Sequence, residues 1–231
     1  MKKLSSIIII LIFGISLVHA QEKYLSITGG YTIPVGNFGE SDTSNTESGY
    51  AQKGYNFNFE MSFYFNDILG LGADLRFNNC NFNSAIFNDL LEERFKNEVD
   101  TINLTSGNYN LHNFLIGPII KVNLGEKISI YGKVFIGVLS AYRPSQTLVY
   151  RFYGQELTTK ATIGKYTGAF AYNFGAGVMF KLTNRFGLNI SADYIAGNPT
   201  FETYDYRTLD YVQKKQEIAY LNYNAGVLLT F

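Results

Sequence analysis

The sequence lacks tryptophan and is poor in cysteine, histidine and proline, with one Cys, two His and four Pro in 231 residues. A single cysteine, Cys80, cannot form an internal disulfide, so disulfides do not hold the fold together. Beyond the N-terminal region there is no apolar run of the roughly 18 residues that identify a membrane-spanning helix. The 19 basic and 19 acidic residues balance, which gives no indication of a nucleic-acid partner.

The N-terminal segment has the features of a secretory signal peptide. Lys2 and Lys3 precede a 12-residue apolar run from Ile7 to Val18, and the segment closes on the small residue Ala20. We expect cleavage after Ala20, which assigns residues 1–20 to a removed signal and residues 21–231 to one mature domain. No cysteine follows the expected cleavage site, so a lipid-anchored N-terminus is not indicated.

Alternation with a period of two is clearest in YNFNFEMSFYFN, residues 55–66. The odd positions are aromatic or apolar, and the even positions are polar except for Tyr64. Because successive side chains of a strand point to opposite faces, this segment is predicted to be a β-strand with one apolar face. Aromatic residues make up 16% of the chain, which also favours strands over helices.

Seven further segments repeat the pattern and bring the predicted strands to eight: 24–33, 69–82, 114–124, 128–142, 166–182, 186–196 and 218–231. No charged side chain lies on the apolar faces. Those within the strands fall on the opposite face, namely Glu60, Asp74, Arg76, Lys121, Lys133, Lys181 and Asp193. This sorting matches lipid outside and a polar lumen. We therefore predict an all-β fold, an eight-stranded antiparallel up-and-down transmembrane β-barrel with short periplasmic turns and four long surface loops.

The spacing of the strands predicts the register of the hairpins. Three connections leave the same three-residue gap between apolar faces, at 66–68, 125–127 and 183–185, and these are the expected periplasmic turns. The long segments 36–54, 83–110, 144–165 and 198–217 are the candidate surface loops. Within the second, apolar residues at near-helical spacing indicate a short amphipathic helix: Phe87, Leu90, Leu91, Phe95 and Val99. Pro118 lies on an outward strand face and removes a ladder hydrogen bond, so we expect a bulge there.

The chain resembles the small outer-membrane β-barrel proteins of the PorT-like family of Bacteroidota, and more loosely the OmpA and OmpX type of barrel. The resemblance covers residues 24–231 and rests on TGGYTIPVGNF (28–38), GLGADLRF (70–77), GPIIKVNLG (117–125), GKVFIGVLSAY (132–142) and GVLLTF (226–231). None of these is a catalytic motif. The terminal Phe231, preceded by alternating apolar residues, looks like the signal that barrel-insertion machinery recognises.

A search for chemistry in the sequence finds no enzymatic set. Once the signal is removed, His112 is the remaining histidine. Lipid A deacylases, which resemble this architecture, have a His-x-Ser pair, whereas His112 is followed by Asn113 and Phe114. Cys80 has no second cysteine or histidine beside it and is interpreted as a packed side chain. The glycine pairs at 70–72 and 175–177 lie inside strands and should relieve crowding. The acidic residues of the second loop lack the spacing of a calcium loop. No cofactor and no metal are predicted.

The inward charges form the most informative set. An eight-stranded barrel has an interior that side chains about fill, so the lumen should be plugged. The predicted first turn places Glu60 directly opposite Asp74, and two adjacent carboxylates require a cation or a shared proton. Arg76 and Lys133 are inward at similar heights, and we predict that these four residues form one interior ionic network. A gated proton or ion path is the functional alternative.

The sequence leaves three functional interpretations open. The first is a non-enzymatic barrel in the outer membrane of a Gram-negative bacterium, which acts through surface loops or supports an envelope or secretion assembly. Its expected partners are outer-membrane lipids, the barrel-assembly machinery during biogenesis, and an unidentified surface or envelope protein. The second is a lipid-modifying enzyme, which a Ser or Asp close to His112 in space would support. The third is a soluble lipocalin-like carrier with its apolar faces inward.

Overall fold

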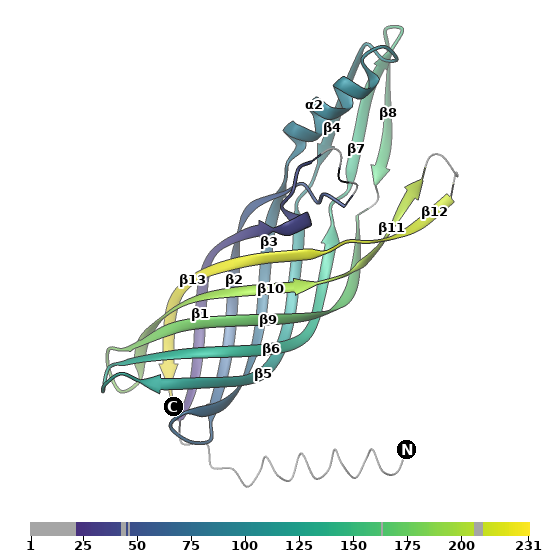
Figure 1. Ribbon diagram of the computed structural model, residues 1–231. Coiled ribbons are helices and arrows are strands. Elements are labelled where there is room, and N and C mark those ends of the chain that lie inside the picture. The colour runs from purple at the N-terminus through teal and green to yellow at the C-terminus, as the bar shows by residue number, and fades with distance from the viewer. Residues whose placement is uncertain (1–21, 43–44, 46, 163, 206–209) are drawn as a thin grey trace, which may run out of the picture.

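The computed structural model describes residues 22–231 except 43–44, 46, 163 and 206–209. The predicted signal peptide and its cleavage site lie outside the described residues. Eight antiparallel strands form a closed barrel in the order β1-β13-β10-β9-β6-β5-β3-β2 (Figure 1). Their bounds are β1 Glu22–Val35, β2 Ala51–Tyr64, β3 Leu69–Phe82, β5 Tyr109–Asn123, β6 Ile128–Arg143, β9 Lys165–Lys181, β10 Phe186–Gly197 and β13 Ile218–Thr230. The eight-stranded antiparallel barrel predicted from the sequence is confirmed.

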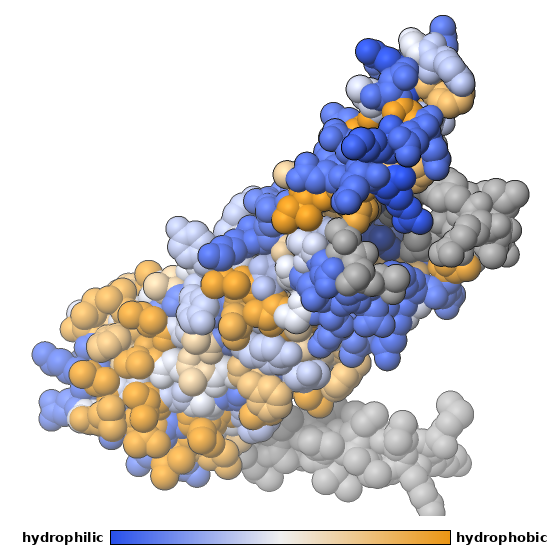
Figure 2. All heavy atoms as spheres, turned by 45° about the horizontal axis from the view of Figure 1, so that its top comes forward, coloured by the Kyte–Doolittle hydropathy of each residue, from blue (hydrophilic) through white to orange (hydrophobic). Residues whose placement is uncertain are grey.

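The two faces of the barrel wall are sorted as the alternation predicts. On β2 the odd positions, such as Phe57 and Phe63, are exposed on the outside, whereas Asn58 and Glu60 are buried in the interior. Figure 2 shows the outward apolar side chains gathered around the part of the barrel that carries the short turns. The apolar faces therefore point to lipid and the polar faces to the lumen. This orientation is the reverse of a lipocalin-like carrier, so that interpretation is wrong.

The three short turns have one geometry. In each, the backbone N–H before the turn donates to the carbonyl after it: Phe65 to Leu69 at 2.9 Å, Leu124 to Ile128 at 2.8 Å, and Leu182 to Phe186 at 2.9 Å. Side chains complete two of the turns, because Asn66 accepts from the Leu69 N–H at 2.7 Å and Thr183 from the Phe186 N–H at 3.0 Å. The register that the sequence predicted for these hairpins is confirmed, including the pairing of Glu60 with Asp74.

The long surface segments contain more regular structure than the sequence analysis assigned to them. Helix α2 spans Ser84–Phe95, as the apolar spacing indicated, although Val99 lies beyond its end. Strands β4 Thr101–Ser106, β7 Gln146–Phe152 and β8 Gln155–Thr162 form a separate three-stranded sheet, and β11 Thr200–Asp205 pairs with β12 Asp210–Lys215. The first segment contains the short helix η1 Gly36–Phe38. The four long surface segments are present as predicted, and the structure adds strands to them: β7–β8 and β11–β12 are local hairpins, and the β4–β7 pairing joins parts of the chain that are distant in sequence.

Two of these segments combine into one body outside the barrel. Strand β4 from the second segment pairs with β7 from the third over Thr101–Ser106 and Gln146–Arg151. Asn88 of α2 fixes the helix to β4, since its amide accepts from the Leu104 N–H at 2.6 Å and donates to the Leu104 carbonyl at 3.3 Å. We call the body made of α2, β4, β7, β8 and their connections the outer extension. It projects from the end of the barrel opposite the short turns (Figure 1).

Pro118 does not produce the bulge expected from its missing N–H. It pairs with Leu71 on one side, in a register that is unbroken along the whole β3–β5 ladder. On the other side, the pairs Ile116 with Ile136 and Ile119 with Lys133 keep the same register across Pro118. The outward ring is accommodated within a regular ladder, so the expected irregularity is wrong.

Among the described residues, no helix is long and apolar enough to cross a bilayer.

Candidate functional site

The structure brings the four predicted interior residues together near the middle of the lumen. Glu60 comes from β2, Asp74 and Arg76 from β3, and Lys133 from β6, and all four side chains are buried. Arg76 Nη2 lies 2.5 Å from Asp74 Oδ2, and Lys133 Nζ lies 3.9 Å from the same oxygen. Lys133 also donates to Glu60. Each of the two facing carboxylates therefore has a cation beside it.

A fifth residue, Asp193 on β10, completes this group. Its two carboxylate oxygens lie 3.2 Å from Arg76 Nη2 and 2.9 Å from Lys133 Nζ. We call Glu60, Asp74, Arg76, Lys133 and Asp193 the lumen network. The sequence placed Asp193 on the inward face, but no local hairpin relates β10 to β3, so its membership did not follow from the predicted registers. The alternation shows that Asp193 points inward, and the strand tilt of a closed barrel could have placed it at the height of Arg76 and Lys133.

The lumen network contains three carboxylates and two cations. Neutral side chains donate hydrogen bonds to Asp193 and so stabilise the excess negative charge. Asp193 accepts hydrogen bonds from Asn224 Nδ2 at 3.1 Å, Ser191 Oγ at 3.2 Å and Asn173 Nδ2 at 3.3 Å. Buried charges persist when they are paired and hydrogen-bonded. Asp193 is thus the best-coordinated member and links both cations.

Two glycines predicted to relieve crowding make room for inward side chains. A Cβ on Gly175 would lie 2.5 Å from Lys133 Cε and 2.2 Å from Asp193 Oδ1, and one on Gly72 would lie 2.5 Å from Phe135 Cζ. A side chain at either position would force these inward side chains to shift, so the glycines leave the room in which Lys133 and Phe135 cross the lumen. Gly175 on β9, the strand between β6 and β10, thereby leaves space for Lys133 to reach Asp193.

A second ionic group lies at the end of the lumen with the short turns, and the sequence analysis did not predict it. Glu22 accepts from Lys121 and from Tyr24, and its other oxygen lies 3.0 Å from Lys181 Nζ. Lys121 also stands over the ring of Tyr64, with Nζ 4.4 Å from the ring centre. Lys121 and Lys181 were recognised as inward residues, but Glu22 precedes the predicted first strand, so its role was missed.

Aromatic side chains gather at the other end of the lumen. We call this set the mouth cluster, and its rings lie 5.1 Å apart for Phe38 and Tyr109, 5.0 Å for Tyr50 and Phe87, and 5.7 Å for Phe82 and Phe87. The hydroxyl of Tyr109 donates to the Gly49 carbonyl at 2.9 Å, which fixes the first surface segment over the opening. Burial and the nearby charge of Asp42 raise the pKa of the Tyr50 hydroxyl. Helix α2, through Phe87, contributes to this cover.

His112 lies on the outward face of β5, in aromatic surroundings. Its ring is 5.3 Å from that of Phe77 and 5.7 Å from that of Tyr166. Its direct cross-strand partner on β6 is Ser140, so a hydroxyl does stand beside the histidine. Among the described hydrogen bonds, however, none joins the two side chains, and no acidic side chain orients the ring.

The remaining sequence candidates carry no chemistry in the described part of the chain. Cys80 is fully buried in the interior face of β3, as expected for a packed side chain. Within the described residues, no three His, Cys, Asp or Glu side chains are placed to hold a metal ion. The carboxylates of the lumen network are paired with Arg76 and Lys133.

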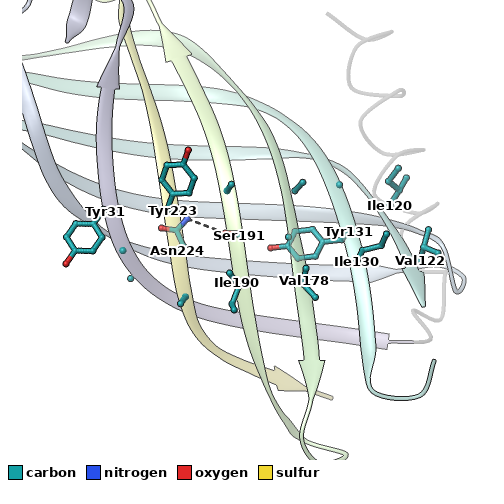
Figure 3. A pocket seen from close by; sticks show the side chains of 17 residues that line it. Tyr31, Ile120, Val122, Ile130, Tyr131, Val178, Ile190, Ser191, Tyr223 and Asn224 are labelled. Carbon is teal, nitrogen blue, oxygen red and sulfur yellow. Dashed lines mark hydrogen bonds between the residues drawn. The ribbon is translucent and has the colours of Figure 1, made fainter. Parts of the chain in front are cut away.

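The outer wall has a shallow hollow of about 850 Å³ (Figure 3). Its floor follows the cross-strand row Gly132, Ala176 and Ala192, and larger outward side chains such as Ile130 and Ile190 border it. Asn224 and Ser191, also drawn in Figure 3, are joined by a 3.3 Å hydrogen bond on the interior side. The hollow belongs to the apolar wall and presents no charged group.

Comparisons with known proteins identify the architecture. The family model described as outer membrane protein beta-barrel domain matches residues 7–227. A comparison with curated proteins gives no match. The outer membrane protein OprG from Pseudomonas aeruginosa is 12% identical, with 92% of this chain and 97% of that chain covered and a TM-score of 0.49. Ail, the attachment invasion locus protein of Yersinia pestis, is 17% identical (91% and 100% covered, TM-score 0.42), and the outer membrane protease OmpT from Escherichia coli is 11% identical (92% and 98% covered, TM-score 0.45). These likenesses concern the fold alone.

Proposed function

Because the chain belongs to the outer membrane protein beta-barrel domain family and is an outer-membrane barrel, we propose that it works without catalysis, has a closed lumen, and acts through its outer extension. Export by a signal peptide cleaved after Ala20, insertion by the barrel-assembly machinery and contact with outer-membrane lipids are parts of this proposal. The narrower resemblance to PorT-like barrels of Bacteroidota also belongs to it, and rests on the motifs in β1, β3, β5, β6 and β13.

Closure of the lumen is supported at three levels. The mouth cluster covers the outer opening, the lumen network bridges β3, β6 and β10 at mid-height, and the Glu22 group with Tyr24 and Tyr64 fills the other end. The side chains of Tyr64, Arg76, Phe135 and Tyr220 are each fully buried in the interior. Large buried side chains at all three levels support the proposal that a hydrated solute has no continuous path through the described part of the barrel.

The outer extension is the observation that carries the proposed role. Its two contributing segments pair with each other over six residues each, and α2 buries Ile102 and Leu104 of β4. Ordering this much chain outside the membrane opposes its conformational entropy, and the barrel is already closed without it. Exposed segments positioned by a rigid scaffold are where binding residues concentrate. We therefore assign the extension to contact with a surface or envelope component.

Photocrosslinking in intact cells tests this role. A photoreactive residue would replace Glu93 on α2 or Glu156 on β8, both exposed, with Val134 on the lipid-facing wall as the matched control. We expect one defined macromolecule to be captured from both extension positions and not from position 134. Assembled barrels that give the same crosslinks at all three positions would refute a role for the extension.

Single-channel conductance tests separately whether the lumen is closed. The purified protein in a planar bilayer should show no steady single-channel conductance in potassium chloride. A reproducible open level would overturn the closed lumen without deciding what the extension does.

The cross-strand pair of His112 and Ser140 favours a second candidate, modification of a membrane lipid at the outer wall. A serine nucleophile requires a base within hydrogen-bond reach, and a substrate could bring the two side chains together. This candidate is tested by mass spectrometry of lipid A. Spectra are compared for cells carrying the wild-type chain, Ser140→Ala, or no copy of the gene. Identical spectra in all three strains reject this candidate.

A further inference from the structure

The apolar face of the outer extension is covered close to the barrel and open at its far end. Helix α2 lies over β4 and ends at Phe95, and the chain then turns back toward β4. Ile102 and Leu104 are buried beneath the helix, whereas Phe152 and Leu157, which lie beyond it on the β7–β8 hairpin, are exposed. An open hollow of about 760 Å³ is left between the hairpin and residues 96–100. We call it the tip hollow.

The lining of the tip hollow combines aromatic rings with carboxylates. Tyr150, Phe152 and Tyr153 contribute rings, and the last two are 4.5 Å apart at their centres. The facing segment contributes the carboxylates of Glu98 and Asp100 and the ammonium group of Lys96. Small-molecule sites characteristically join aromatic surface to a few positioned polar groups, at volumes of roughly 300–1,000 Å³. The tip hollow has both the composition and the size of such a site.

The turn at the tip holds Tyr153 in a conformation that a tyrosine rarely adopts. Tyr153 has a φ of 47° and Gly154 a φ of 76°, the left-handed pair of a two-residue hairpin turn. Asn, Asp or Gly is favoured at the first of these positions, and a bulky residue there is strained. Asp100 supports the turn by accepting from the Gly154 N–H at 3.0 Å. The result is a tyrosine ring that is 86% exposed at the edge of the tip hollow.

We propose that the tip hollow is a binding site for a neutral glycan, an inference that rests on the proposed function of the outer extension. A sugar ring stacks its C–H face on the exposed, electron-rich face of Tyr153, and the ring of Phe152, at 73° to that of Tyr153, borders the stacked sugar. Its hydroxyl groups donate to the carboxylates of Glu98 and Asp100. These two kinds of contact match the two halves of the lining.

The observations favour this ligand over other classes. A standard protein interface takes about 800 Å² from each partner, whereas the tip hollow is confined to one hairpin end and one turn. The lining carries two carboxylates and one cation, Lys96, so a sulfated or phosphorylated sugar would meet an excess of negative charge. An acyl chain would leave both carboxylates facing apolar groups. A neutral sugar stacks on the aromatic surface and donates hydrogen bonds to the carboxylates at the same time.

The test uses the full-length chain in phosphatidylcholine nanodiscs, because glycoside detergents would compete for the site. Binding is screened on an array of defined neutral and sulfated oligosaccharides, and calorimetry follows with the best binder. Tyr153→Asn is the main variant, since asparagine tolerates the left-handed conformation and keeps the turn. Tyr153→Phe retains the ring. Glu156→Gln is the matched control, because residue 156 lies on the opposite face of β8 from Leu157.

We expect a neutral oligosaccharide to bind, Tyr153→Asn to weaken it at least about tenfold, and Tyr153→Phe and Glu156→Gln to leave it within about threefold. The stability of Tyr153→Asn toward urea should equal or exceed that of the wild type, so weaker binding would not reflect unfolding. Absence of binding to every neutral glycan, preference for sulfated ones, or equal affinity of Tyr153→Asn would each overturn the site. If glycans fail while crosslinking at positions 93 and 156 still captures a protein, the glycan site is wrong and the role of the extension stands.

Discussion

Removal of the lumen cations should destabilise the barrel far more than removal of one acid. In Lys133→Leu, Glu60 loses its cation and Asp193 keeps only Arg76. In Arg76→Leu, Asp74 keeps only the distant Lys133, 3.9 Å away. Glu60→Gln, by contrast, leaves two carboxylates with two cations and still accepts a hydrogen bond from Lys133. The three variants therefore compare the loss of a cation, which leaves carboxylates uncompensated, with the loss of one carboxylate at nearly constant side-chain volume.

The expected magnitudes follow from burial. Removing one partner of a fully buried ion pair costs about 3–5 kcal/mol, because the other charge is left without compensation. The double variant Arg76→Leu with Lys133→Leu should exceed either single variant but fall short of their sum, since both cations share Asp193. Glu60→Gln should change the free energy of unfolding by about 1 kcal/mol or less.

Urea titration of the protein in lipid vesicles, followed by tyrosine fluorescence and by the gel mobility of unboiled samples, measures these differences. Lys181→Leu is the matched control, because its partner Glu22 is one-third exposed and such pairs contribute about 0–1 kcal/mol. If the double cation variant unfolds at the wild-type urea concentration, or if Glu60→Gln is as damaging as Lys133→Leu, the charge argument for the lumen network fails.

Three further changes test other parts of the structure. Val134→Arg, on the outward face near mid-height, should destabilise by roughly 2–4 kcal/mol in the same titration, whereas Val134→Leu should be near neutral, and equal stability of these two variants would refute the lipid-facing assignment of Val134. Gly175→Ala should cost about 1–3 kcal/mol because its Cβ meets Lys133, whereas Gly168→Ala, with open space around its Cβ, should be near neutral. Phe231→Asp should lower the amount of heat-modifiable barrel in outer-membrane fractions, because it replaces the exposed apolar side chain that follows β13, the proposed insertion signal, with a charge. Unchanged membrane levels would count against Phe231 as an insertion signal.

The barrel could be predicted from the sequence because its determinants are local. Each strand carries its own alternation, and each short turn fixes the register of the two strands beside it, which is how Glu60 was placed opposite Asp74. Asp193 illustrates the limit of this reasoning. Its height relative to Arg76 depends on how all eight strands are staggered when the barrel closes, and no single hairpin contains that information.

The outer extension was not predicted because its strands are short and the β4–β7 pairing is distant in sequence. Strand β4 has six residues and pairs with a strand that begins 40 positions after its own end. The tip turn, Tyr153-Gly154, also lacks the Asn-Gly or Asp-Gly signal by which two-residue hairpins are normally recognised. Tyr153 at a left-handed position is the reason that the hairpin was not recognised from the sequence. The same position leaves the Tyr153 side chain exposed.

A strained tyrosine of this kind is tolerated because the barrel provides the stability that the tip lacks. A non-glycine residue in the left-handed region costs roughly 1–2 kcal/mol, and at Tyr153 this cost falls on a hairpin tied to β4 along Thr101–Ser106 and to Asp100 through Gly154. The closed ladder of the barrel does not depend on that hairpin, so selection can act on the tip without affecting assembly. Under the proposal made for the tip hollow, stability and recognition lie in different parts of one chain. Substitutions in the wall and lumen should change the amount of assembled protein, and substitutions at the tip should change what the assembled protein binds.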